Sequence, residues 1–278
     1  MKTIGEIVRL SVDYVQKKEG RPRREVEEWI AHILGLQRLD LYLMFDRPVE
    51  DGELAAIRLG LPRLAIGEPL AYIIGSAPFY GLDFEVSPDV LIPRPETETL
   101  ITVAKGFLAS QKTPGTIFDI CTGSGCIGLT LKTLFPQWHV VLSDISEQAL
   151  AIARRNAQKM GADVEILHGN LLEPFSGRKA HVIVANPPYL STAEWLSLDS
   201  SVASFEPRLA LDGGAVGTEM YQNLFAAIPS FLLPKGLCVV EIGACQGPAI
   251  LSLAHSFASS FLVQDLAGHD RVVAFSVS

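Results

Sequence analysis

Apolar residues over the first quarter of the chain recur at helical spacing. Ile4, Ile7 and Val8 fall on one face of a helix, and residues 26–34 repeat the pattern. The alternation of apolar and polar residues that marks a half-buried strand does not occur in this region. The pattern therefore predicts a small all-α domain over residues 1–76.

Residues 77–98 have the pattern of a β-hairpin followed by a proline-rich hinge. Apolar residues alternate loosely around Gly81, as they do in a short hairpin. The segment LIPRPETE, residues 91–98, then combines two prolines with three charged side chains. It is either a plain linker or the lining of a site between two domains, and the residues alone leave both interpretations open.

From residue 113 onward, apolar strands alternate with helices. Strands are expected at residues 116–120, 139–143, 164–167, 181–185, 237–242, 261–266 and 271–277. Strands that alternate with helices build a doubly wound, mostly parallel sheet. The last connection, residues 267–270, is too short for a crossover helix, so the final strand is expected to run antiparallel to its neighbour. Residues 99–278 are therefore predicted to form one α/β domain with a seven-stranded sheet.

Composition narrows the classes of protein that are compatible with the chain. Its formal net charge of −8 does not favour a nucleic-acid partner. No stretch of about 18 apolar residues occurs, and Glu6 and Arg9 interrupt the apolar residues at the start of the sequence, so we expect neither a membrane span nor a signal peptide. The four cysteines lack the spacing of metal ligands, so no metal site is expected either. We expect a cytoplasmic monomer.

The turn after the first strand of this sheet carries three glycines at the spacing of a nucleotide-binding loop. It reads DICTGSGCIG over residues 119–128, and Gly123, Gly125 and Gly128 match G-x-G-x-x-G. Glycine lets the backbone approach a ligand closely and adopt a positive φ. The pattern is shared with dinucleotide sites, so the glycines alone do not separate S-adenosylmethionine from NAD.

Two carboxylates favour S-adenosylmethionine as the ligand of this turn. Asp119 lies within the turn, where its charge would repel a pyrophosphate and attract an ammonium or sulfonium group. Asp144 ends the next strand and can accept hydrogen bonds from both ribose hydroxyls, a feature that NAD enzymes share and that does not discriminate alone. It could instead cap the helix that begins near Ser146. Asn170 and Leu171, after the third strand, either contact the adenine or form a plain turn.

The fourth strand runs directly into Asn186, Pro187, Pro188 and Tyr189. Consecutive prolines can simply end a strand, but this strand end lies beside the cofactor turn. An amide or aromatic amino nitrogen is a poor nucleophile because its lone pair is delocalised. The side-chain oxygen of Asn186 and the carbonyl of Pro187 would hold its N–H groups and stabilise the developing charge, while Tyr189 packs against the planar group. The two motifs together predict methyl transfer to such a nitrogen.

With both motifs placed, the chain resembles the HemK/PrmC family of protein-(glutamine-N5) methyltransferases, which modify the Gly-Gly-Gln glutamine of class 1 peptide chain release factors. The resemblance covers nearly the whole chain and includes residues 91–98, 119–128, 186–189 and 206–214, the last of which read EPRLALDGG. It implies a class I S-adenosylmethionine-dependent methyltransferase domain, a helical N-terminal domain that docks the substrate, and release factors as partners.

The resemblance also assigns residues to the site. The cofactor would contact Asp119, Cys121, Thr122, Gly123, Ser124, Gly125, Asp144, Asn170, Leu171 and Asn186. The glutamine would lie against Asn186, Pro187, Pro188 and Tyr189, with Phe79 and Arg94 closing the pocket; Asn186, Pro187 and Tyr189 would be catalytic. Two positions depart from typical members: Cys121 stands where many have glycine, and Asn170-Leu171 where some have an acid followed by an aromatic residue.

Three alternatives differ in substrate or in class. The same chemistry could act on adenine N6 of DNA or guanine N2 of rRNA, which the acidic composition disfavours. A binding module without activity would fail to bind S-adenosylmethionine. An NAD-dependent dehydrogenase would leave residues 186–189 unexplained.

Overall fold

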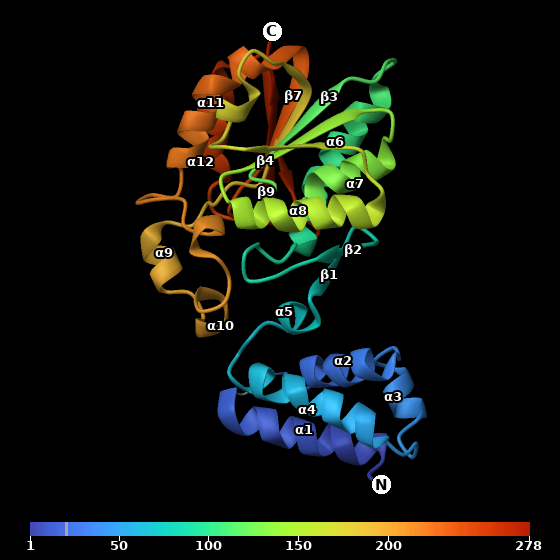
Figure 1. Cartoon of the computed structure of the whole chain (residues 1–278). Coiled ribbons are helices and arrows are strands. Elements are labelled where there is room, and N and C mark those ends of the chain that lie inside the picture. The colour runs from blue at the N-terminus through green and yellow to red at the C-terminus, as the bar shows by residue number, and fades with distance from the viewer. Residues whose placement is uncertain (20–21) are drawn as a thin grey trace. The chain divides into compact units, whose positions relative to one another are not determined.

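The computed structural model describes residues 1–19 and 22–278 and divides the chain into two compact units (Figure 1). The first unit comprises Met1–Ser76 and Asp199–Phe205, and the second comprises Ala77–Leu198 and Glu206–Ser278. Within the described residues, no helix is long and apolar enough to cross a membrane.

The first unit is helical, as its apolar spacing predicts. Its helices are α1 (Ile4–Glu19), α2 (Arg23–Leu34), α3 (Asp40–Leu43), α4 (Asp51–Ala65), α5 (Leu70–Ile74) and α10 (Ser200–Ala203). Ile4, Ile7 and Val8 are buried in one apolar cluster with Trp29. The Trp29 indole N–H donates to the carbonyl of Ile57 at 2.9 Å, so the ring is both packed and hydrogen-bonded.

The second unit begins with the hairpin of β1 (Ser76–Phe79) and β2 (Leu82–Glu85). Its two turn residues, Tyr80 and Gly81, have φ values of 50° and 77°, the left-handed conformation that a two-residue hairpin loop requires. A proline-containing turn, η1 (Pro95–Thr97), follows and leads into helix α6 (Glu98–Ser110).

A seven-stranded sheet forms the centre of the second unit. Its strands are β3 (Thr116–Ile120), β4 (His139–Asp144), β5 (Glu165–His168), β6 (Ala180–Ala185), β7 (Leu232–Glu241), β8 (Ser259–Gln264) and β9 (Asp270–Ser276). The order across the sheet is β5-β4-β3-β6-β7-β9-β8. The first five strands are parallel, and β9 runs antiparallel to both of its neighbours, which confirms the predicted sheet and its final strand.

Helices cover both faces of this sheet (Figure 1). One face packs against α6, α7 (Cys126–Leu134) and α8 (Glu147–Met160), and the other against α11 (Glu219–Phe231) and α12 (Gly247–Leu253). Because successive strand residues point to opposite faces, Ile117 joins the first layer and Phe118 the second. Shorter elements complete the unit: η2 (Glu173–Phe175), α9 (Thr192–Leu196), η3 (Arg208–Ala210) and η4 (Ala254–Ser256).

The element ends follow the expected capping residues, and one strand is longer than predicted. Ser146 caps α8 by accepting a hydrogen bond from the Ala149 N–H at 3.1 Å, and Gly161 ends the helix with a φ of 61°. β7 begins at Leu232 rather than at residue 237, because the proline and glycine of LLPKGL are accommodated in an irregularity where the register shifts.

Candidate active site

The register of the parallel strands aligns four side chains at one edge of the sheet. β3 pairs with β4 and with β6, and β6 pairs with β7. The last paired residues of these four strands lie side by side, and they are Ser143, Ile120, Ala185 and Val240. The carboxyl ends of these strands meet at this edge, where ligands of such folds bind. The next residue of each strand along the chain is, in order across the sheet, Asp144, Cys121, Asn186 and Glu241.

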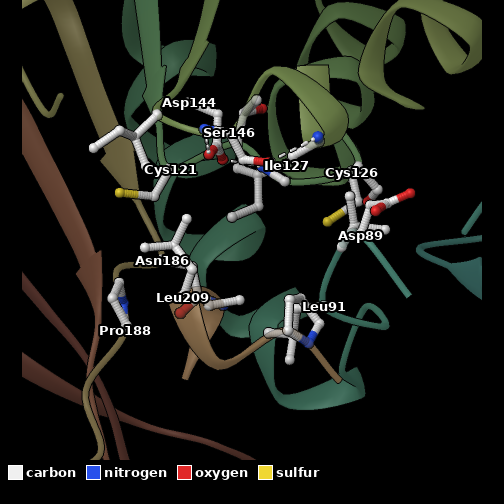
Figure 2. Close-up of a pocket in the computed structure, with 18 of the residues that line it drawn as sticks. Asp89, Leu91, Cys121, Cys126, Ile127, Asp144, Ser146, Asn186, Pro188 and Leu209 are labelled. Atoms are coloured by element: carbon white, nitrogen blue, oxygen red, sulfur yellow. Dashed lines mark hydrogen bonds between the residues drawn. The ribbon is translucent and has the colours of Figure 1, made fainter. Parts of the chain in front are cut away.

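A cavity of about 220 Å³ opens at this edge and lies within the second unit (Figure 2). Figure 2 shows side chains of the cofactor turn, of Asn186 and of Leu91 around one open space. Of the residues assigned from the sequence, those that line the cavity are Arg94, Cys121, Thr122, Gly123, Ser124, Asp144, Asn170, Leu171, Asn186 and Pro188. The structure therefore brings together both motifs, the hinge segment and the candidate adenine contacts.

The glycine turn is fixed from one side by the Asp144 carboxylate. The Gly123 N–H donates to Asp144 Oδ2 at 2.9 Å, and the Ser146 N–H donates to its Oδ1 at 2.9 Å. Burial raises the pKa of Asp144, and these backbone hydrogen bonds oppose that rise. The helix cap is Ser146 itself, so Asp144 links the turn to the start of α8 while its carboxylate lines the cavity.

Asp119 supports the turn from behind and does not line the cavity. Its side chain is fully buried, and Oδ2 accepts hydrogen bonds from the Thr122 hydroxyl at 2.5 Å and from the Gly128 N–H at 2.8 Å. Burial raises the pKa of Asp119 to about 7, while those two hydrogen bonds lower it. A Cβ at residue 128 would overlap Leu142 and Asp119, which explains the glycine there.

Asn156 of α8 connects the turn to the hairpin. Its side-chain N–H groups donate to the carbonyl of Ser124 at 2.9 Å and to that of Glu85 at 3.0 Å, while its oxygen accepts from the Glu85 N–H at 2.7 Å. Because the oxygen and the nitrogen of this buried amide are both hydrogen-bonded, Asn156 fixes the turn at Ser124 relative to the end of β2 at Glu85. The hairpin is thereby fixed against the candidate cofactor turn.

The tetrapeptide that follows β6 is held by η1 and by the loop after β7. Asn186 Nδ2 donates to the Thr97 hydroxyl at 3.5 Å. Gln246 Nε2 donates to the carbonyl of Tyr189 at 2.8 Å, and Gln246 Oε1 accepts from the Gly243 N–H at 3.0 Å. Burial raises the pKa of Tyr189 to about 12, so this phenol stays neutral. Pro187 and Tyr189 lie in the tetrapeptide but do not line the cavity.

Two loops far apart in the sequence meet at the rim of the cavity. Arg94 forms a charged hydrogen bond with Glu206, whose side chain is 2% exposed. Leu91 and Pro93, from the segment that carries Arg94, and Leu209, from the segment that carries Glu206, line the cavity. The segment of residues 91–98, for which the sequence left two interpretations open, is thus a lining of the cavity.

Phe79 does not close the pocket, contrary to the expectation from the sequence. It is 2% exposed and packs edge-on against Phe84, with ring centroids 6.1 Å apart, inside the apolar layer on the α6 side of the sheet. The turn of the hairpin directs the ring into the core, where its apolar surface is removed from water.

Burial keeps the two thiols at the cavity in their neutral form. Cys121 and Cys126 both line it, and Figure 2 shows their sulfur atoms near the open space. Burial raises the pKa of Cys126 to about 12 and raises that of Cys121 as well. All four cysteines are free, and no cluster of three metal-ligating side chains occurs in residues 1–19 and 22–278.

Residues that the sequence reasoning missed are Thr97, Asn156, Glu241 and Gln246. One signal was available for Glu241, a single acid at the end of the otherwise apolar run LCVVEIG. A carboxyl group in such a run is buried unless the strand lies at an edge, and buried carboxyl groups have partners.

The two units match separate family models. Residues 7–75 match the PrmC N-terminal domain, and residues 101–199 match the methyltransferase small domain. The release factor glutamine methyltransferase of Geobacter sulfurreducens is 40% identical over 274 residues, which cover 98% of this chain and 95% of that protein. The chain belongs to the release factor glutamine methyltransferase family. The member of this family from Bacillus subtilis is 36% identical and covers 98% of this chain and 97% of its own length.

Solved structures share the fold of this release factor glutamine methyltransferase family member at low sequence identity. The catalytic domain of human Mettl16 aligns with a TM-score of 0.59 and 13% identity, over 84% of this chain and 94% of its own. The 16S rRNA methyltransferase RsmC of T. thermophilus, in complex with AdoMet and guanosine, aligns with a TM-score of 0.55 and 15% identity, over 73% of this chain and 50% of its own. These similarities establish the methyltransferase fold predicted from the sequence.

Proposed function

We propose that the protein transfers a methyl group from S-adenosylmethionine to the side-chain amide nitrogen, N5, of the glutamine in the Gly-Gly-Gln motif of class 1 peptide chain release factors. The observation that carries the proposal is that Asn186 and the glycine turn border one cavity. The similarity over 98% of the chain to proteins named release factor glutamine methyltransferase supports a release-factor glutamine, rather than a nucleobase, as the substrate.

The cavity edge fits S-adenosylmethionine in charge and in space. The Asp144 carboxylate lines the cavity and can accept hydrogen bonds from ribose hydroxyls. Gly123 has a φ of 55°, and a Cβ there would meet no heavy atom within 4 Å, so the turn leaves room for a ligand. When bound, S-adenosylmethionine supplies an electrophilic methyl group on a positively charged sulfur.

The tetrapeptide then activates the glutamine amide by position rather than by a strong base. Asn186 Oδ1 accepts one amide N–H, and the carbonyl of Pro187, which lies between the lining residues Asn186 and Pro188, accepts the other. These two hydrogen bonds hold the amide plane and leave the nitrogen lone pair exposed on its face. The same two acceptors stabilise the positive charge that develops on nitrogen, and they do so without reorganisation because prolines fix the backbone. Once methylated, the nitrogen is acidic enough to release its proton to water.

Apolar side chains at the rim limit, without abolishing, the access of water to the reacting atoms. Leu91, Pro93 and Leu209 line the cavity, and the Arg94–Glu206 pair joins the loops that carry them. Exclusion of water strengthens each hydrogen bond to the amide and prevents its N–H groups from being solvated instead.

The test is incubation of the protein with S-adenosylmethionine and a purified release factor, followed by mass spectrometry of the peptides. We expect the mass of one CH2 unit to be gained on the Gly-Gly-Gln peptide and to map to the glutamine side chain. A release factor in which that glutamine is replaced by alanine is the matched control and should gain nothing. Methylation of a nucleic acid, with no gain on the release factor, would contradict the proposal.

A further inference from the structure

Glu241 is a buried carboxyl group that the proposed mechanism leaves without a role. It ends β7 beside Asn186 in the row at the sheet edge, and it is 1% exposed. Its carboxyl group lies within hydrogen-bonding range of the side chains of Thr97 and Asn186. Its other oxygen, Oε2, has no hydrogen-bond partner among the described residues.

This carboxyl group does not stabilise the fold by pairing with a cation. Burial raises the pKa of Glu241 to about 7; Thr97, Arg271 and Asn186 lower it, and the charge of Glu96 raises it. Arg271 forms its salt bridge with Asp265, at 3.1 Å, rather than with Glu241. An incompletely paired buried acid costs folding free energy. An apolar residue at this position would give a more stable fold, so we look for a role of the carboxyl group other than stability.

The atoms that surround the Asn186 amide identify that role. An asparagine side chain has two N–H donors and one acceptor oxygen, and its two orientations exchange them. In its ionised form, above about pH 7, the Glu241 carboxylate accepts hydrogen bonds and does not donate them, so it faces Nδ2. The Thr97 hydroxyl accepts from Nδ2 at 3.5 Å, and the same hydroxyl lies within hydrogen-bonding range of the Glu241 carboxyl group, to which it can donate its proton. Both partners therefore select the orientation that leaves Oδ1 for the cavity.

We propose that Glu241 is a positioning residue for methyl transfer, which fixes the Asn186 amide with its oxygen toward the substrate nitrogen. The inference rests on the proposed function, because that function gives the Asn186 oxygen its task. In the opposite orientation Nδ2 would point at the N–H groups of the substrate amide, and two donors would face each other. The buried acid thus maintains the one orientation in which the site can bind and activate an amide.

The experiment compares Glu241→Leu with Glu241→Gln, using an intact release factor as substrate. Leucine removes the acceptor, so we expect kcat to fall about 10- to 100-fold, the usual range for a lost hydrogen bond to a charged group. The Kd for S-adenosylmethionine and the KM for the release factor should change by less than about threefold, because other residues bind both. Glutamine keeps an acceptor oxygen, so Glu241→Gln should restore kcat to within about fivefold of the original protein.

Two further variants separate positioning from a structural effect. Tyr221→Phe removes a buried hydrogen bond from the same strand, that of the Tyr221 hydroxyl to the Glu241 backbone carbonyl at 2.8 Å, and should leave kcat unchanged. In the Asn186→Ala background, Glu241→Leu should cause no additional loss, since it acts only through Asn186. If Glu241→Leu does not fold, Thr97→Val breaks the same arrangement and takes its place in both comparisons.

Three outcomes would overturn the inference. They are an unchanged kcat in Glu241→Leu, a Glu241→Gln variant as slow as the leucine variant, and additive losses in the Asn186→Ala background. Each of them presupposes that the unsubstituted protein methylates the release factor. If the unsubstituted protein does not, it is the proposed function that has failed, so the two failures are distinguishable.

Discussion

Asn186 and Asp119 both lie near the carboxyl ends of their strands, at the sheet edge where the cavity opens, yet their side chains have different surroundings. Asn186 lies one step beyond its strand and lines the cavity. Asp119 is inside β3 and alternates with Phe118, so its side chain points toward the α7 layer, beneath the turn. Sequence spacing located both residues at the correct edge. It could not give the direction of the Asp119 side chain, which depends on where the strand stops.

Replacement of Asn186 by alanine removes the proposed acceptor of the substrate N–H. We expect turnover to fall by about 10²- to 10³-fold, the usual loss when one preorganised polar contact is removed, while the affinity for S-adenosylmethionine changes little. Methyl-transfer rates and calorimetry measure the two effects. Asn223→Ala, an exposed asparagine on α11, is the matched control and should behave as the original protein. Near-normal turnover in Asn186→Ala would show that its assigned role is wrong.

Replacement of Asp119 by asparagine should change how stability depends on pH. The folded protein holds this proton up to about pH 7, whereas the ordinary pKa is 3.8, so folding takes up a proton between these values. The free energy of unfolding therefore falls in this window as pH rises, by about 1 kcal/mol per pH unit from this group. Asparagine cannot titrate, so Asp119→Asn should gain stability relative to the original protein from pH 4 to about 7.

Urea denaturation at a series of pH values measures this difference, and Glu165 supplies a control of opposite sign. The hydrogen bond from Arg178 lowers the pKa of Glu165, so its contribution is present above the ordinary pKa and is lost as pH falls. Glu165→Gln should therefore lose stability relative to the original protein as pH rises through the acid range. A stability difference between Asp119→Asn and the original protein that does not change with pH would mean that folding leaves the pKa of Asp119 at its ordinary value.

At the scale of the elements, strand and helix placement followed from apolar periodicity. The α8 boundaries were readable because Ser146 and Gly161 carry the cap chemistry in their side chain and backbone. The beginning of β7 could not be predicted from the sequence. Pro234 and Gly236 indicate the end of a strand, but in the structure β7 continues through them with a shift of register. Local residue preferences report on isolated segments, and here pairing with β6 overrides them.

Two helical glycines should respond in opposite directions to alanine. Gly106 lies exposed in α6, and a Cβ there would meet nothing within 4 Å, so Gly106→Ala should stabilise the protein by about 0.5–1 kcal/mol. In Gly128→Ala the new methyl group would overlap Leu142 and the Asp119 carboxylate, so a loss of about 1–3 kcal/mol or more is expected. Urea denaturation of both variants at one pH compares them. An unchanged free energy of unfolding in Gly128→Ala would mean that the turn can shift to accommodate the added methyl group.

At the scale of the whole molecule, the sequence indicated which motifs belong to one site but not what holds them together. The cavity, both motifs and the hinge segment lie within the second unit. The contacts that join them, such as Arg94 with Glu206 and Gln246 with Tyr189, link residues 112 and 57 positions apart. No pattern along the chain encodes such pairs, because each partner taken alone is an ordinary polar residue.

The charge of the whole chain leads to a prediction about nucleic acid. A net charge of −8 gives no general attraction to phosphates, so we expect no tight binding to an rRNA fragment in fluorescence anisotropy. Titrations at about 50 and about 200 mM salt make the test sensitive, because phosphate contacts weaken steeply over that range. A basic RNA-binding protein is the positive control. Tight binding that collapses with salt would revive a nucleobase as substrate.

The order of strands in the sheet differs from the order in which a ribosome produces them. β9 lies between β7 and β8, and Val272 pairs with Glu241. The cofactor turn and the tetrapeptide emerge from the ribosome long before residues 270–276, but until β9 has been made the edge of β7 carries unpaired N–H and C=O groups. The strand that presents Glu241 to Asn186 is completed only then. A nascent chain interrupted before this point holds both motifs and still lacks the scaffold that makes them an enzyme.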